Sequence, residues 1–219
     1  MRAVGTIGLL AAGILMLLAA APASAQNAPT RDDIVAKLDK YQSDLELDVP
    51  ALRQQVTERS KSRGKNEPPP QKRPAIAPDL NKLPAFNVDI TFDVDTPIVQ
   101  PESYQTVGRI ADALVHSSLL PYTFLVVGHI EANGRREANA ILSQRRADAI
   151  REILVNTFKI SAKRIQSVGL GEEQLVDSAR PTAPVNNQIQ IITLSKIPEA
   201  EQPAAATPAA KKQPAKKKK

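Results

Sequence analysis

Between residues 87 and 194 the hydrophobic positions of the chain switch between two spacings. Val88, Ile90 and Phe92 alternate with polar residues, which is the pattern of a strand with one buried face. Short apolar stretches indicate three further strands, and longer stretches of helical period indicate two helices. In chain order the expected elements are strand 87–92, helix 101–114, strand 122–127, helix 136–157, strand 165–169 and strand 188–194. This order, β-α-β-α-β-β, predicts an α+β sandwich over residues 85–196, with helices packed on one face of a small sheet.

The segment before this sandwich has a different pattern. Thr30 stands before Arg-Asp-Asp, which predicts an N-cap followed by acidic residues in a first helical turn. Apolar residues then recur at helical intervals up to Leu45, and Pro50 ends that helix before a shorter second one. Residues 26–60 therefore predict a short helical spacer, which the small number of heptads favours over a partner-binding coiled coil. Residues 61–84 carry six prolines among charged residues and predict a stiff, extended linker.

Both ends of the sequence have a biased composition. Arg2, an uncharged stretch at 4–21 and a small-x-small pattern at 23–25 predict a secretory signal at 1–25, with an uncleaved membrane anchor as the alternative. Residues 197–219 are rich in Ala, Pro and Lys and predict a disordered tail. Six lysines after residue 210 account for the whole net charge of +6. Charge in this position argues against a folded nucleic-acid interface and favours a tether to anionic envelope surfaces, with simple solubility as the alternative.

The composition of the 219-residue chain narrows its chemistry. It has no cysteine, which excludes disulfides, thiolate metal sites and a cysteine nucleophile, and its two histidines leave little room for a histidine metal site. His129 and Glu131 lie two residues apart, and alone they supply neither a metal triad nor a nucleophile with its base. We therefore expect no enzyme activity, no metal and no cofactor.

One pair of charged residues is unusual in its position. Arg146 lies between Leu142 and Ile150 on the apolar stripe of the second expected helix, and Asn139 falls on the same stripe. A guanidinium in such a row must be paired or must line a pocket. Glu131 follows the second expected strand in a polar turn. A carboxylate and a guanidinium in one pocket suit a zwitterion such as an amino acid. The alternatives are an ion pair between these two groups or another structural ion pair for Arg146.

The residues around this pair resemble the OmpA-like C-terminal domain family. The family pattern is GHTD-x-x-G-x-x-x-x-N-x-x-LS-x-x-RA with a later G-x-GE. In this chain it is matched by GHIE at 128–131, Gly134, Asn139, LSxxRA at 142–147 and GLGE at 169–172. FDVD at 92–95 looks like the family's FDFD, and the resemblance covers about residues 86–194. It implies a non-catalytic periplasmic module that binds peptidoglycan non-covalently, at the cell wall or outer membrane of a Gram-negative bacterium.

The same resemblance implies a site for the diaminopimelate of the peptidoglycan stem peptide. In the family, the Asp of GHTD holds the ammonium at the end of the diaminopimelate side chain, and the Arg of LSxxRA holds its carboxylate. These roles fall on Glu131 and Arg146 in this sequence. Asn139, Asp95 and the backbone around Ile130 are then expected to provide supporting contacts.

Three departures from the family pattern leave a second interpretation open. Glu131 is longer than the family's Asp, and Ile130 lacks the hydroxyl of the family's Thr. The family's late NRRV is Asn-Asn-Gln-Ile at 186–189, without the two arginines, for which Arg180 is a candidate substitute. Each lost charge-assisted contact costs roughly 1.5–3 kcal/mol. The alternative is therefore a degenerate module that serves for docking or spacing, while the helices at 30–60 bind a protein partner.

Overall fold

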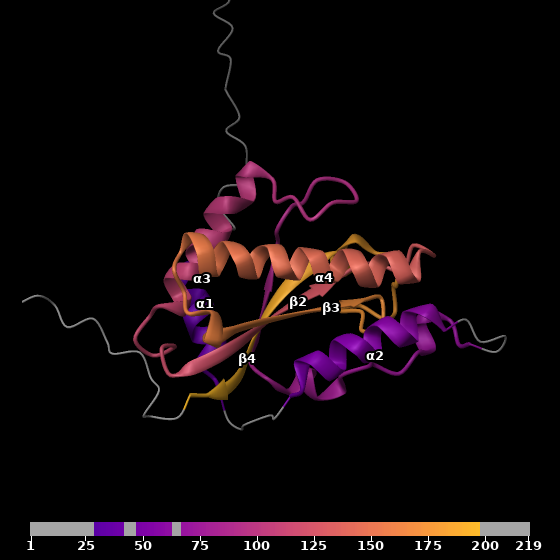
Figure 1. Cartoon of the computed structure of the whole chain (residues 1–219), viewed down its shortest axis with the longest axis horizontal. Coiled ribbons are helices and arrows are strands. Elements are labelled where there is room, and N and C mark those ends of the chain that lie inside the picture. The colour runs from indigo at the N-terminus through magenta and orange to yellow at the C-terminus, as the bar shows by residue number, and fades with distance from the viewer. Residues whose placement is uncertain (1–28, 42–46, 63–66, 198–219) are drawn as a thin grey trace, which may run out of the picture.

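The computed structural model describes residues 29–41, 47–62 and 67–197 (Figure 1). The expected signal at 1–25 and nearly all of the expected lysine-rich tail lie outside these ranges, so both stay predictions. No helix within the described ranges is long and apolar enough to cross a membrane.

The core of the fold is a four-stranded sheet in the order β1-β4-β2-β3. Its strands are β1 (Ala85–Val88), β2 (Tyr122–His129), β3 (Ile165–Gly171) and β4 (Gln188–Lys196). β4 runs antiparallel to both β1 and β2, whereas β2 and β3 are parallel. The apolar stretch in β2 reflects burial on both faces: Phe124 and Val126 point into one core, and Leu125 and Val127 into another. The expected β-α-β-α-β-β order is confirmed.

The first core lies under two helices, α3 (Tyr104–Leu114) and α4 (Arg136–Glu152), which precede β2 and β3 respectively. α4 continues into a π-helical turn at Ile153–Thr157. The first strand ends earlier than predicted, because the ladder with β4 stops at Val88 and Phe92 forms only an isolated bridge with Val99. Ile90 and Phe92 nevertheless still pack against this core, which explains their alternating pattern.

The short helix α1 (Arg31–Leu38) also packs on the first core. Thr30 is the N-cap of this helix, as the sequence predicts, and it forms a capping box with Asp33. Ile34 and Leu38 are fully buried, and the carbonyl of Leu38 accepts a hydrogen bond of 2.8 Å from the Thr193 hydroxyl of β4. The apolar residues Ile34 and Leu38 of this helix are therefore buried within the protein and are not exposed for a partner.

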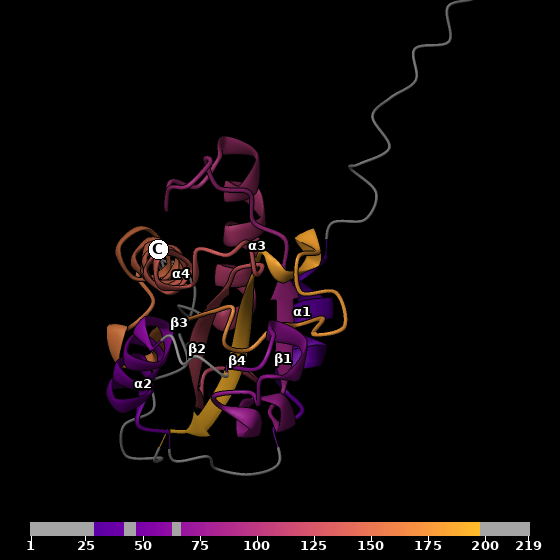
Figure 2. The ribbon, with the colours of Figure 1, turned by 90° about the vertical axis from the view of Figure 1, so that its right-hand side faces the viewer.

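The second core is covered by α2 (Val49–Lys61) and by residues 67–84, which we call the strap (Figure 2). The strap contains 3₁₀ turns at Pro70–Lys72 and Pro78–Lys82. Leu52 and Val56 of α2 and Leu80 of the strap pack with Leu125 of β2. We expected a spacer and an extended linker here, and the structure instead packs the described part of both segments on the sheet. The sequence pattern shows which residues are apolar, but it does not show which face they cover.

α4 lies directly against β2 and β3, because glycine occupies the points of closest approach. A Cβ at Gly128 would lie 2.3 Å from the Ser143 carbonyl oxygen, and one at Gly169 would lie 2.0 Å from the Gln144 nitrogen. No larger residue fits at either position. This contact fixes the side chains of α4 relative to the turn that follows β2, where the candidate site lies.

Candidate functional site

A cleft of about 370 Å³ lies where β2 ends, between the turn at 130–133, the loop at 89–95 and α4. The structure brings all of the expected site residues into its lining. These residues are Asp95, Ile130, Glu131, Asn139 and Arg146.

Arg146 supplies the cleft with a cation that forms no ion pair with any described carboxylate. Its Nε donates to the carbonyl of Thr96 at 3.0 Å, and its guanidinium carbon lies 4.7 Å from the centre of the Phe92 ring. Burial lowers the pKa of Arg146, and the nearby Asp95 carboxylate opposes that shift. An arginine remains charged in proteins. Among the described residues, Arg146 has no ion-pair partner, and its two terminal nitrogens have no hydrogen-bond acceptor.

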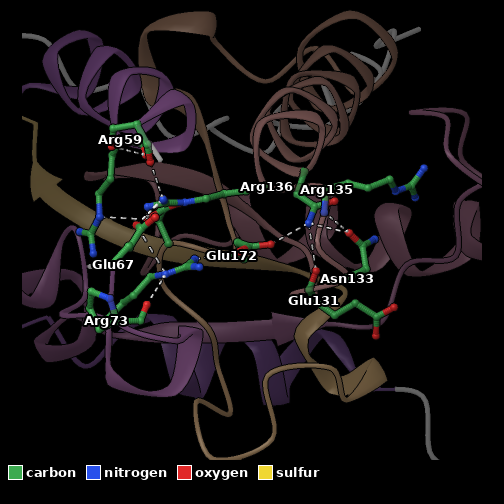
Figure 3. A network of polar contacts seen from close by, with 12 residues as sticks. Arg59, Glu67, Arg73, Glu131, Asn133, Arg135, Arg136 and Glu172 are labelled. Carbon is green, nitrogen blue, oxygen red and sulfur yellow. Dashed lines mark hydrogen bonds and ion pairs between the residues drawn. The ribbon is translucent and has the colours of Figure 1, made fainter. Parts of the chain in front are cut away.

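Glu131 supplies the anion, and its hydrogen bonds to other described residues are made by its backbone. Its N–H donates to Oδ1 of Asn187 at 3.0 Å, and its carbonyl accepts from Nδ2 of Asn139 at 3.2 Å. Within the described part of the chain its carboxylate has no partner, and in Figure 3 the side chain extends away from Glu172. Glu131 and Arg146 therefore face one cleft without neutralising each other.

Asn139 and Ile130 hold the frame of the cleft. Asn139 is 2% exposed, and its Nδ2 donates to the Glu131 carbonyl, to Oδ1 of Asn133 at 2.9 Å and to Oε2 of Glu172 at 2.9 Å. The N–H of Ile130 donates to the Gly171 carbonyl at 3.1 Å. Both donors are engaged within the protein, so these residues support the turn that carries Glu131.

Asp95 is engaged by a residue that the sequence analysis missed. Arg135, which immediately precedes α4, makes two hydrogen bonds of 2.8 and 3.0 Å to the Asp95 carboxylate. These contacts lower the pKa of Asp95. Asp95 itself has a φ of 55°, in the left-handed region that non-glycine residues rarely adopt. The two residues are 40 positions apart, and no local pattern connects them.

The segment at 177–189 carries amides at Asn187 and Gln188, where the family pattern has two arginines. Asn186, which matches the family's own Asn, bonds to the protein. The Asn186 side chain is fully buried, donates to the Arg180 carbonyl at 2.9 Å and accepts from the Asp177 N–H at 2.8 Å. The guanidinium of Arg180, the candidate substitute, pairs with Asp177 at 2.7 Å and does not line the cleft. Asn187 is the residue of this segment that lines it.

A network of charged side chains, in which Arg136, Glu172 and Glu173 are buried, lies behind the cleft (Figure 3). It joins three arginines to three glutamates: Arg59, Arg73, Arg136, Glu67, Glu172 and Glu173. α2 and the strap supply Arg59, Glu67 and Arg73, while Glu172 and Glu173 follow β3. In the sequence, Glu172 stands out only as part of the GLGE motif. Its partner Arg73 is 99 residues away, so spacing alone does not reveal the pair.

Part of the chain matches a known protein family. The sequence model of the OmpA family matches residues 91–188. The chain carries an OmpA family domain. The domain extends over the cleft, including Asp95, Glu131, Asn139 and Arg146, whereas α1, α2 and the strap precede the matched residues.

Relatives of this OmpA family domain include two groups of envelope proteins. Outer membrane porin F of Pseudomonas aeruginosa is 33% identical over 107 residues, which are 46% of this chain and 30% of that protein. Peptidoglycan-associated lipoprotein of Brucella melitensis is 31% identical over 87 residues, which are 40% of this chain and 50% of that protein. The chain therefore spans half or less of the length of these relatives. The solved structure of the peptidoglycan-associated lipoprotein from Burkholderia pseudomallei is 25% identical, with a TM-score of 0.37, and covers 50% of this chain and 87% of that one.

Proposed function

We propose that this protein is a non-catalytic envelope protein that binds peptidoglycan non-covalently through the cleft of its OmpA family domain. The observation that carries the proposal is the pair of opposite charges, Arg146 and Glu131, that line one cleft and are not neutralised by any described side chain. The name of the Brucella relative, a peptidoglycan-associated lipoprotein, supports this reading. The protein would then act in the periplasm, at the cell wall or outer membrane of a Gram-negative bacterium.

The ligand in this proposal is the side-chain terminus of diaminopimelate in the stem peptide. That terminus carries an ammonium and a carboxylate on the same carbon. The carboxylate would accept hydrogen bonds from the terminal nitrogens of Arg146, and the ammonium would donate to the carboxylate of Glu131. Both are charge-assisted bonds, which are roughly twice as strong as neutral ones. The Asp95–Arg135 pair would form the wall of the site.

A second candidate function is a docking or spacer domain with no affinity for peptidoglycan. The hydrogen bonds around the cleft favour it, because the Ile130 N–H, the Asn139 amide and the Asp95 carboxylate already bond to the protein. Asn187, where the family pattern has an arginine, adds no charge. In this case Arg146 and Glu131 would be remnants of a former site.

A sedimentation assay with isolated peptidoglycan sacculi distinguishes the two functions. Wild-type protein would be compared with Arg146→Ala at moderate salt, with and without free meso-diaminopimelate. Arg145→Ala is the matched control, because Arg145 is the neighbouring, exposed arginine on the same helix and does not line the cleft.

We expect binding that free diaminopimelate reduces, that Arg146→Ala loses and that Arg145→Ala keeps. No binding, or binding that responds to neither the competitor nor Arg146→Ala, would support the docking function. Equal losses in the two variants would indicate a general electrostatic attraction to the wall.

A further inference from the structure

The strap reaches the cleft through one of its arginines. Arg73 donates from Nη1 to Oε1 of Glu172 at 2.7 Å, and Oε2 of the same carboxylate accepts from Nδ2 of Asn139 at 2.9 Å. The same Nδ2 donates to the carbonyl of Glu131 at 3.2 Å. Three side chains therefore connect the strap to the backbone of a residue that lines the cleft. Figure 3 shows these contacts running between Arg73 and Glu131.

Glu172 depends on this arrangement because its carboxylate lies away from water. The residue is 4% exposed, and among the described residues Arg73 is its ion-pair partner and Asn139 its amide donor. A buried carboxylate that loses its cation is left with an uncompensated charge. It then takes up a proton or draws other donors toward itself. Either change alters how Glu172 bonds to Asn139.

The Asn139 amide transmits that change to the turn after β2, because it has more hydrogen-bond acceptors than hydrogens. An amide nitrogen has two hydrogens, whereas three acceptors lie within hydrogen-bond distance of this one. Glu172 is the only charged acceptor of the three and takes the strongest bond. The second hydrogen is divided between Asn133 and Glu131, in the turn after β2. The charge on Glu172 therefore sets the orientation of the amide that holds this turn.

We propose that Arg73 is a positioning residue of the cleft, acting through Glu172 and Asn139 on the turn that carries Glu131. The effect on ligand affinity rests on the proposed function, whereas the effect on the Asn139 amide does not. Arg73 lies outside the residues that match the OmpA family. The strap is thus a second layer added to the domain, and it holds the cleft in shape from the opposite side of the turn.

The test compares Arg73→Gln with Arg59→Gln in the full chain. Arg59 is the matched control, because it also bonds to a buried glutamate, at 2.9 Å, but that glutamate is Glu173, whereas the glutamate that accepts from Asn139 is Glu172. The first measurement, made without ligand, is the position of the Asn139 side-chain amide signals in proton–nitrogen NMR spectra. The second is the Kd for meso-diaminopimelate, and thermal melting is recorded for every variant.

We expect Arg73→Gln to shift the Asn139 amide signals and to raise the Kd by about fivefold, the effect of one ordinary hydrogen bond. Arg59→Gln lowers the melting temperature but leaves both readouts at their wild-type values. Glu172→Gln, a variant of the same shape, reproduces the shift if Arg73→Gln does not fold. The Kd effects of Arg73→Gln and Glu172→Gln do not add when combined.

Unchanged Asn139 signals in both Arg73→Gln and Glu172→Gln would overturn the proposal, as would equal shifts with Arg59→Gln. If wild-type protein binds no diaminopimelate, the proposed function fails, and the Asn139 signals still decide the positioning role. Shifted signals with an unchanged Kd would overturn the role of Arg73 in the cleft and leave the proposed function standing.

Discussion

Arg135 holds both oxygens of the Asp95 carboxylate, with Nη2 2.8 Å from Oδ1 and Nη1 3.0 Å from Oδ2. A parallel pair of this kind is the strongest geometry available to arginine and carboxylate. It joins the loop after β1 to the start of α4 across the cleft. It also engages Asp95 with Arg135, so that the charge of Arg146 remains available on the same wall.

This pair predicts a measurable change in the titration of Asp95. The hydrogen bonds and charge of Arg135 lower the pKa of Asp95, so Arg135→Gln should raise that pKa toward its ordinary value. Because the folded pKa is the lower one, the pair stabilises the folded protein above about pH 4 and stops doing so as the pH falls through the lowered pKa. Carbon NMR titration of the Asp95 carboxyl group tests this directly. Identical titration curves in wild type and variant would show that the ion pair does not form in solution.

The close contact between α4 and the sheet predicts that alanine at Gly169 lowers the free energy of unfolding, in contrast to alanine at a helical glycine with free space. A Cβ at Gly169 would meet backbone atoms of Gln144 at 2.0 Å, so Gly169→Ala should destabilise the fold by about 3 kcal/mol or more. Gly108 of α3 is the control, because a Cβ there lies 3.7 Å from the Phe158 ring, an ordinary contact. Gly108→Ala should stabilise the protein, by up to about 1 kcal/mol. Urea unfolding measures both, and equal effects would mean that α4 does not lie this close to β3.

The order of elements in the domain could be predicted from the sequence, because Val88, Ile90 and Phe92 pack on the core as their alternation indicates. On α4 the buried row runs through Ser143, Ala147 and Ile150, so Arg146 lies beside this row and not at its centre. The packing of α2 and the strap could not be predicted. Their apolar residues are visible in the sequence, but the face that receives them belongs to β2 and β3, which come much later in the chain. A local pattern carries no information about such a distant partner.

The candidate site also has residues that the sequence predicts and residues that it does not. Glu131 and Arg146 could be proposed because the motif and the apolar stripe place them near the same strand end. The partners that hold the site could not, since Arg135 meets Asp95 across 40 residues and Arg73 meets Glu172 across 99. Ion pairs between distant residues have no sequence period. They become apparent only once the fold brings them together.

His129 predicts a dependence of stability on pH. It lies at the end of β2, is 4% exposed, and donates from Nδ1 to the Gln174 carbonyl at 2.8 Å, since a carbonyl can only accept. Burial lowers the pKa of His129, and the bond to Gln174 partly opposes this. Below about pH 6.5 the unfolded chain therefore binds a proton that the folded chain does not, and the free energy of unfolding falls. Urea unfolding between pH 8 and pH 5 should show this decline, and His129→Gln should remove the part that His129 contributes. A decline of the same slope in the variant would assign it to other groups.

The proposed division of roles between Arg146 and Glu131 predicts a selectivity that each substitution changes differently. A stem peptide with meso-diaminopimelate and the same peptide with lysine, both with blocked ends, differ only in the side-chain carboxylate. Wild-type protein should prefer the first about tenfold to a hundredfold, the range that one charge-assisted bond provides. Arg146→Ala should bind both peptides equally and at the level of the lysine peptide, whereas Arg145→Ala should keep the preference. Glu131→Gln should weaken the binding of both peptides by the same factor, because both peptides retain the ammonium. Isothermal titration calorimetry measures all four proteins, and a preference that survives in Arg146→Ala would remove Arg146 from carboxylate recognition.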